Sequence, residues 1–226
     1  MRTIQLEIPT SLSDIKLWQY QEYLKVVDEL SEGELHKKLI ELFCGVSMED
    51  VDSIPMSEAD KVLEVLKTAF SEEPDLIRHF TLAETEFGFI PKLDEMSLGE
   101  YIDVESYISD WQEMHNAMAV LYRPVNAKIK DKYTIAPYKP SEGISEIMKE
   151  MPMDAVMSSL VFFYRLGIQL SKATLRYTEA QLTKTTNLHL KETLEKNGVG
   201  INQFMDSLKE TYSDLTKLPQ SLSTSV

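Results

Sequence analysis

The spacing of apolar residues along the chain predicts a mainly helical protein with a small β component. Apolar side chains recur at three- and four-residue steps in several segments, as on one buried face of a helix. We expect these helices to begin near residues 17, 31, 57, 97, 111, 142, 152 and 201. Two short runs, 3–8 and 87–91, have a period of two or a dense apolar content and predict strands.

Residues that begin and end helices support this assignment. Ser97 stands three positions before Glu100, the pattern of a capping box, and Ser57 before Asp60 indicates a cap with an acidic third residue. Ser31 and the acidic residues that follow it are expected to open another helix. Gly45 predicts a left-handed helix end, and Pro124 predicts the end of the helix that starts near Trp111.

Other local patterns predict the remaining elements. We expect a helical turn at 75–80 and a hairpin formed by 127–129 and 133–135. Leu98 and Tyr101 are expected to start the buried stripe of their helix. The long helix from Pro152 is expected to break near 183–187.

The two halves of the chain share a pattern that predicts an internal repeat. Four blocks in the first half match, in the same order, four blocks in the second. The matched blocks are 3–9 with 85–91, 15–20 with 96–101, 36–46 with 115–125, and 54–56 with 151–153. An insertion at about 126–143 explains the larger offset of the last pair, and chance similarity among common residue types is the alternative.

The repeat predicts two β-α-α-α modules followed by C-terminal helices. Repeat 1 covers 1–70, repeat 2 covers 85–167, a helical extension covers 168–218, and a flexible tail covers 219–226. The strand at 3–8 is expected to pair with the strand near 87, because neither is stable as an isolated edge. The helices from residue 153 onward would pack across both halves, so that the chain forms one compact unit.

Composition narrows the class of protein. The 226 residues are 43% hydrophobic, enough to bury about 70% of the unfolded surface without disulfides or metals. The net charge of −14 disfavours nucleic acids and anionic membranes as partners and is compatible with a basic protein surface. The single cysteine, Cys44, fits a reducing compartment and a buried position. No signal peptide or membrane-spanning run is visible, which predicts a soluble protein.

Motifs for catalysis, cofactors and metals were not found in the sequence. It contains no glycine-rich phosphate loop, no zinc-type cluster and no nucleophile elbow, so we expect no catalytic, cofactor-binding or metal-binding residues. His36 and His115 occupy matching positions in the two repeats. They would form either a paired polar site between the repeats or two helix–helix contacts with ordinary hydrogen bonds. The acidic run at 94–105 could hold a general acid or simply form a solvated helix start.

Two features are candidate partner-binding sites. Arg123 follows an apolar helix and could fix a carboxylate of a partner, or else cap the helix or pair within the protein. A group of methionines surrounds one helix start and could form an adaptable binding surface or fill the core. This group consists of Met148, Met151, Met153 and Met157.

Several segments form a recognisable set: EFGFIPKLDEMSLGEYIDVESYISDWQEMHNAMAVLYRPV, YTIAPY and MPMDAVMSSLVFFYRLG, with TSLSDIKLWQYQEYL and IELFCG nearer the N-terminus. Together they resemble a group of uncharacterised virion or tail-assembly proteins encoded by tailed bacteriophages. The resemblance covers most of residues 1–170, implies a role in phage morphogenesis and carries no catalytic residues.

These observations predict a non-enzymatic phage morphogenesis protein that acts through protein–protein contacts. It would be a tail-assembly chaperone or a structural virion component, such as a head–tail connector or an internal protein. Its partners would be other phage structural proteins or further copies of itself, in the host cytoplasm during assembly and, for a structural component, in the virion. The alternatives are a small metal-independent enzyme with a site around His36 and His115, and a regulator that mimics nucleic acid through its negative charge.

Overall fold

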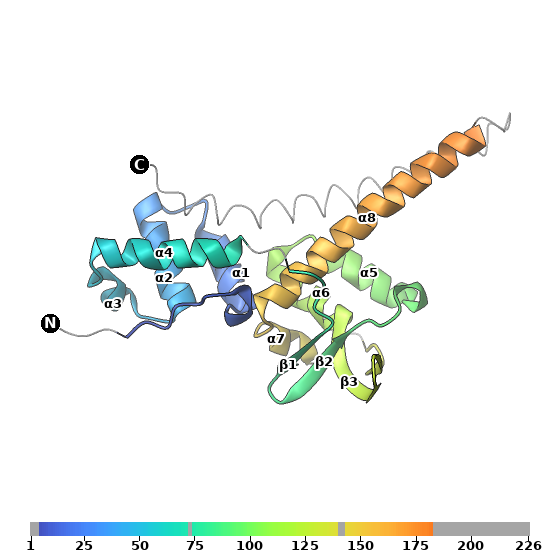
Figure 1. The fold of residues 1–226 in the computed structure, drawn as a ribbon, viewed down its shortest axis with the longest axis horizontal. Helices are drawn as coiled ribbons and strands as arrows, with labels where there is room; N and C mark the ends of the chain where they lie inside the picture. Colours follow the sequence, from blue (N-terminus) through green and yellow to red (C-terminus); the bar gives the residue numbers. More distant parts are fainter. Residues whose placement is uncertain (1–4, 72–73, 140–142, 183–226) are drawn as a thin grey trace.

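The protein is mainly helical and contains a four-stranded antiparallel sheet, as the spacing of apolar residues predicts. The computed structural model describes residues 5–71, 74–139 and 143–182, with side chains described as far as residue 169. The helices of the first 70 residues gather at one end of the molecule (Figure 1). The sheet and the helices that follow it form the other end, and the longest helix starts between the two and projects outward.

The N-terminal part consists of four α-helices after a short 3-10 turn. These elements are η1 (Leu12–Asp14), α1 (Leu17–Val26), α2 (Glu32–Cys44), α3 (Met48–Asp52) and α4 (Met56–Phe70). α2 begins after Ser31 as predicted, where Ser31 and Glu34 form a capping box, and Gly45 ends it with a left-handed φ of 66°. The prediction that Ser57 caps α4 is wrong, because the helix already begins at Met56, directly after Pro55.

The second part combines the sheet with further helices. Its elements are β1 (His79–Leu82), β2 (Thr85–Phe89), η2 (Leu93–Glu95), α5 (Leu98–Tyr107), η3 (Trp111–Glu113), α6 (Met114–Leu121), β3 (Tyr122–Ile129), β4 (Lys132–Ile135), α7 (Ile144–Met148) and α8 (Met153–Leu182). The strands follow chain order in the sheet, β1-β2-β3-β4. The predicted hairpin between 127–129 and 133–135 is confirmed by the pairing of β3 with β4.

The predicted partner of β2 is wrong. We expected residues 3–8 to pair with it, but residues 5–8 form no strand, and β1 and β3 occupy both sides of β2. The helical turn predicted at 75–80 is also wrong, because residues 75–78 have no regular secondary structure and β1 begins at His79. The apolar residues Leu6 and Ile8 instead pack against the core from an extended segment.

The helix α6 ends earlier than we predicted from the position of Pro124. It stops at Leu121, and the chain passes directly into β3, where Pro124 lies opposite Phe87. Proline cannot donate to a neighbouring strand, and the register of β3 against β4 becomes irregular between Val125 and Ala127. The carbonyl of Pro124 remains paired, because it accepts a hydrogen bond from the amide of Ala136 at 2.8 Å.

The internal repeat is not shown by the structure. α1 and α5 do begin at the matched residues Leu17 and Leu98, and each is followed by a helix of the matched pair, α2 or α6. However, α2 leads to α3 and α4, whereas α6 leads to β3 and β4. The first module also lacks a strand within residues 5–70, so duplication stays a prediction.

A single hydrophobic core connects the two parts. The cluster of buried side chains includes members of α1, α2 and α4 as well as β2, α6 and α8. Backbone hydrogen bonds join the start of α1 to the segment between α7 and α8. The amide of Leu17 donates to the carbonyl of Met151 at 2.9 Å, and that of Met153 donates to Ile15 at 2.8 Å. The buried face that we predicted for α8 is present at Met153 and continues along its first turns.

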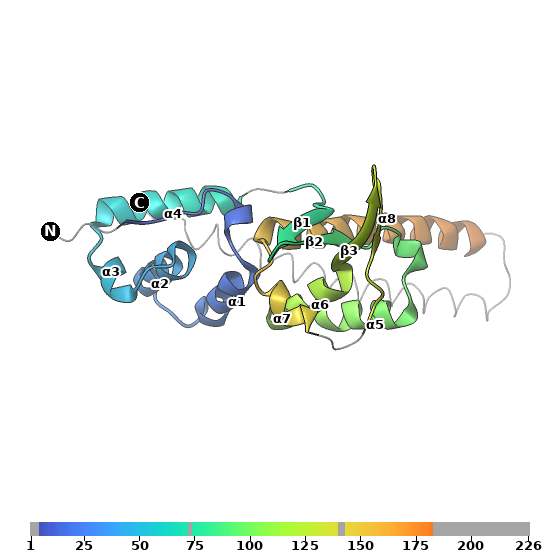
Figure 2. The same cartoon turned by 90° about the horizontal axis from the view of Figure 1, so that it is seen from below.

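α8 runs without interruption across the boundary that was predicted between residues 167 and 168. The rings of Phe162 and Phe163 pack against Phe89 of β2, and the helix then extends beyond the sheet (Figure 1, Figure 2). The predicted break at 183–187, the helix from 201 and the tail at 219–226 fall outside the described residues. Within the described ranges, none of the helices has the length and apolar character needed to cross a membrane.

Gly88 is a position where the sheet has no room for a side chain. A Cβ atom there would lie 2.8 Å from Cε2 of Tyr133 and 3.0 Å from Cγ2 of Val125. Tyr133 reaches over β2 from β4, and its hydroxyl donates to the carbonyl of Phe89 at 2.6 Å. The ring therefore occupies the space that a side chain at 88 would need.

Gly88→Ala is expected to lower the free energy of unfolding by about 1–3 kcal/mol, the usual cost of overpacking a core. Chemical denaturation measures the change. In a Tyr133→Leu background the added methyl group has more room, so the same substitution should cost clearly less. An equal cost in both backgrounds would show that Tyr133 is not the obstacle.

Candidate functional site

The start of α5 places a carboxylate below the protein surface. Ser97 is the N-cap, and its hydroxyl accepts a hydrogen bond from the amide of Glu100 at 3.3 Å. In return, the amide of Ser97 donates to Oε2 of Glu100 at 2.7 Å. This capping box turns the Glu100 side chain back toward the helix start, where it is only 7% exposed.

Arg123 of β3 completes a buried ion pair with Glu100. Its Nη2 lies 2.6 Å from Oε1 of Glu100, and both side chains are about nine-tenths buried. Burial alone would raise the pKa of Glu100. The hydrogen bonds from Ser97 and the charge of Arg123 outweigh that effect, so the pKa is lowered and the carboxylate stays ionised. The arginine fork that could have bound a partner carboxylate is therefore engaged by a carboxylate of the same chain.

Tyr138 covers the ion pair from the segment after β4. The guanidinium carbon of Arg123 lies 6.0 Å from the centre of the Tyr138 ring, within the range of a cation–π contact. The Tyr138 hydroxyl donates to the Asp103 carboxylate on α5. Burial and this hydrogen bond raise the pKa of Tyr138 to about 12, so the phenol remains protonated.

A cavity of about 680 Å³ opens beside these residues. Its walls come from α5, α6, the segment after β4 and the start of α7. They are formed by Asp103, Tyr107, Asn116, Ala119, Val120, Arg123, Ala136, Pro137, Tyr138, Lys139, Ile144 and Ser145. The Nε–H of Arg123 is buried and has no hydrogen-bond partner. Because Glu100 already neutralises Arg123, the cavity suits a polar group without a full charge better than a free anion.

The ion pair makes stability depend on pH. Glu100 has a lowered pKa in the folded protein, so its contribution is fully present above the pKa of an unfolded glutamate, about 4.3. This contribution is lost as the pH falls through the lower, folded-state value. Glu100→Gln should therefore be less stable than the parent chain at pH 7, and the difference should shrink below about pH 4. Urea denaturation at a series of pH values measures it, and a difference independent of pH would contradict the ion pair.

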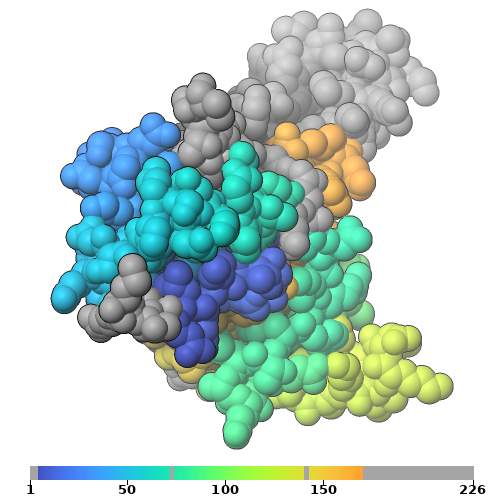
Figure 3. Space-filling model, turned by 60° about the vertical axis from the view of Figure 1, so that its left-hand side comes forward, coloured from blue at the N-terminus to red at the C-terminus, as the bar shows by residue number. Residues whose placement is uncertain are grey.

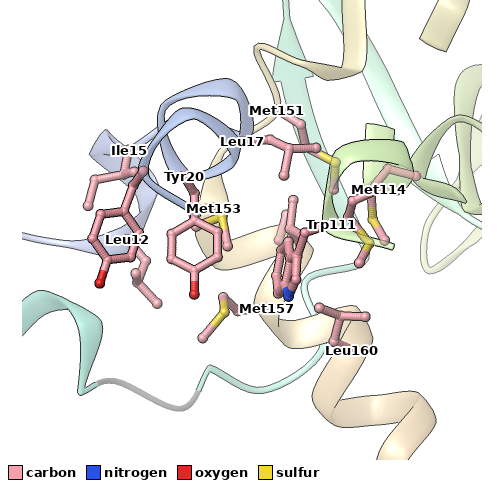
Figure 4. Packing of buried hydrophobic residues seen from close by; sticks show 14 of the residues in the cluster. Leu12, Ile15, Leu17, Tyr20, Trp111, Met114, Met151, Met153, Met157 and Leu160 are labelled. Carbon is pink, nitrogen blue, oxygen red and sulfur yellow. The ribbon is translucent and has the colours of Figure 1, made fainter. Parts of the chain in front are cut away.

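The predicted methionine surface lies in the core. Met148, Met151 and Met153 are fully buried, and Met157 is 5% exposed. In Figure 4, Met153 and Met157 lie near Tyr20, whereas Met151 lies near Trp111. This placement corresponds to the core-packing alternative rather than to a binding surface, and an unbranched side chain suits the irregular space between the two parts of the protein.

The two matched histidines lie in different surroundings. His36 of α2 lines a groove of about 500 Å³ between α2, α3 and α4, and His115 is not among the residues of that groove. His115 of α6 is 8% exposed, and its Nδ1 lies 3.3 Å from Nε2 of Gln21 on α1. Burial and the nearby charge of Lys149 lower the pKa of His115, which favours the neutral ring. These contacts do not bring the two histidines together in a paired site.

Cys44 occupies the buried position that we predicted. It lies at the end of α2 and is 8% exposed. Burial raises the pKa of its thiol to about 11, so the reactive thiolate is scarce near neutral pH.

The outer face of α5 is apolar and exposed. Leu98 is 74% exposed, and Tyr101 and Ile102 are each 48% exposed. The prediction that Leu98 and Tyr101 start the buried stripe is therefore wrong. The helix buries Val104 instead, and Ile108 directly after the helix is also buried. We call the exposed residues Leu98, Tyr101 and Ile102 the α5 face.

Sequence reasoning missed the α5 face and the contacts of Glu100. The helix carries two apolar faces, and the sequence pattern does not say which of them meets the core. The sequence did contain a usable signal. This helix of ten residues has apolar side chains on two sides, which is more than packing against a single core requires.

No known protein family, curated protein or solved structure matches the chain. Among the described residues, no group of three or more His, Cys, Asp or Glu side chains is arranged to hold a metal ion. Function is therefore inferred from the α5 face, the cavity and the charges around them.

Proposed function

We propose that this chain is a non-enzymatic assembly protein of a tailed bacteriophage that acts by binding other proteins. The observation that carries the proposal is the α5 face. Three large apolar side chains at positions i, i+3 and i+4 lie side by side on a helix and remain in contact with water. Single exposed apolar residues are common, but a contiguous group typically marks a protein-binding surface.

The charge around the α5 face indicates the kind of partner. Glu105 continues the same side of the helix one turn after Tyr101, and Asp94 lies just before the helix. Both are exposed and form no ion pair with the described part of the chain. A partner surface with apolar side chains and flanking lysine or arginine residues would complement both features.

The cavity beside Arg123 supports binding rather than catalysis. Arg123 in its wall is neutralised by the buried Glu100 behind it, and Asp103 accepts a hydrogen bond from Tyr138. A general acid or base needs a proton that it can exchange with a substrate near the working pH. The pKa of Glu100 is lowered and that of Tyr138 is raised, so neither group exchanges a proton readily near neutral pH.

The sequence resemblance supports the assignment to phage assembly. It covers most of residues 1–170, which include the α5 face, the ion pair and the cavity. Two roles fit: a tail-assembly chaperone that holds a tail protein before assembly, or a structural component such as a head–tail connector or internal protein. The sequence predicts a duplicated module, and two related helical units would suit either role.

The experiment is inactivation of the gene in the phage that encodes the chain, combined with mass spectrometry of purified particles. We expect unfinished particles, such as heads without tails, to accumulate in infected cells. A chaperone would be absent from parental particles, whereas a structural component would be present at a fixed copy number. Normal yields of complete particles after inactivation would overturn the proposal, as would turnover of a substrate that depends on His36 or His115.

A further inference from the structure

The hairpin formed by β3 and β4 carries a positively charged tip on an acidic protein. Ile129 at the end of β3 is 77% exposed, the highest value among the exposed large apolar residues that the structure describes. It pairs with Lys132 across the hairpin, so the two side chains lie on the same side of the ribbon. Lys130 stands in the turn with a left-handed φ of 55°. We call Ile129, Lys130 and Lys132 the hairpin tip.

The lysines of the hairpin tip are available to a partner. The neighbouring Lys128 is engaged by Glu86 at 2.5 Å, but Lys130 and Lys132 form no ion pair with the residues that the structure describes. Asp131 offsets one of their two charges. The remaining positive charge contrasts with the net charge of −14 of the whole chain.

The hairpin tip stands apart from the body of the molecule. The space-filling view shows it as a projection from the surface (Figure 3). In Figure 2, the end of β3 points away from the molecule on the side opposite α5. The hairpin tip and the α5 face therefore belong to different sides of one molecule.

We propose that the hairpin tip of one copy binds the α5 face of a second copy. The two surfaces are complementary: Ile129 would meet Leu98, Tyr101 and Ile102, and the lysines would approach the exposed carboxylates. Partial burial and the charge of Glu105 both raise the pKa of Tyr101, which places this carboxylate next to the apolar residues. Two chains of net charge −14 repel each other over most of their surfaces, so a cationic projection provides a favourable point of contact.

This contact joins two different surfaces and is therefore head-to-tail. Each copy that binds through its hairpin tip still offers a free α5 face, and the next copy can bind there. Such an interface closes into a ring or continues as a filament. The inference deepens the proposed function and rests on it for its biological purpose.

The test uses two variants of the full chain and sedimentation velocity at low and high salt. The first variant, Lys130→Glu with Lys132→Glu, alters the hairpin tip. The second, Leu98→Ser with Ile102→Ser, alters the α5 face. The control, Lys25→Glu with Lys61→Glu, changes the net charge as much as the first variant but at exposed sites of α1 and α4.

We expect the parent chain and the control to associate at low salt and to dissociate as salt screens the lysines. Each of the first two variants should sediment as a monomer by itself. A mixture of the two should form a one-to-one complex, because one variant keeps an intact α5 face and the other keeps an intact hairpin tip. This complex should not grow further, since its remaining surfaces are the altered ones. Circular dichroism of each variant verifies that it is folded.

Three results would overturn the inference: a monomeric parent chain at all concentrations, association of either variant by itself, or no complex in the mixture. An acidic protein bound at the hairpin tip in place of a second copy would appear together with a monomeric parent chain and would count against self-association. The outcome of the sedimentation experiment does not depend on what gene inactivation does to particle assembly. Failure of self-association and failure of the proposed function are therefore distinguishable.

Discussion

Arg123→Met is expected to lower the free energy of unfolding by about 3–5 kcal/mol. The substitution leaves the Glu100 carboxylate nine-tenths buried without its partner, and Ser97 alone must compensate the charge. The loss of a cation under the Tyr138 ring adds a smaller term. Urea denaturation followed by circular dichroism at pH 7 measures the change.

The control for this prediction removes both charges. Arg123→Met combined with Glu100→Leu leaves no buried charge unpaired, so most of the lost stability should return. A cost below about 1 kcal/mol for Arg123→Met alone would show that water reaches Glu100 and that the pair behaves like a surface salt bridge.

Trp111→Ala should destabilise the protein by a similar amount, about 3–5 kcal/mol, through the cavity that it leaves. Trp111 is 5% exposed, and its ring lies edge-on to Tyr20 of α1 with centroids 4.8 Å apart. It therefore fills the space between the N-terminal helices and the helices around the sheet, as Figure 4 shows. Thermal or chemical denaturation measures the loss.

Trp111→Phe serves as the matched control. The indole N–H of Trp111 is buried without a hydrogen-bond partner, so phenylalanine removes an unsatisfied donor while it keeps most of the apolar ring. We expect a much smaller loss than for alanine. Equal losses for both substitutions would contradict the claim that the volume filled by an aromatic ring stabilises this contact.

The helices could be predicted from sequence because their signals are local. Ser31, Gly45 and Ser97 begin or end helices through contacts with residues only a few positions away. The hairpin of β3 and β4 was found for the same reason, since its strands are close in sequence.

The first hairpin of the sheet could not be found in this way. β1 and β2 are joined by Ala83 and Glu84, which both have left-handed φ values, of 47° and 63°. Such turns usually contain glycine or asparagine, and their absence hid the turn. The strand predicted at 3–8 was then assigned to the vacant side of β2, which β1 in fact occupies.

The site depends on contacts that spacing does not reveal. Glu100 and Arg123 meet because β3 returns beside the start of α5, and nothing near either residue in the sequence records that meeting. The methionines were open to two interpretations because their flexible side chains suit both cores and binding surfaces. For α5, the sequence showed its apolar residues but not which of its two faces would remain exposed.

The central claim is that the protein works through the α5 face, and one measurement tests it most directly. The proposal assigns the gene to a tailed bacteriophage, so Leu98→Ser with Ile102→Ser is introduced into that gene, and complete particles are counted by electron microscopy and by plaque assay. Met56→Ser is the control, because Met56 is 71% exposed and is the first residue of its helix, as Leu98 is of α5. We predict a large loss of complete particles for the α5 variant and none for the control. Normal particle yields from a folded α5 variant would contradict the claim.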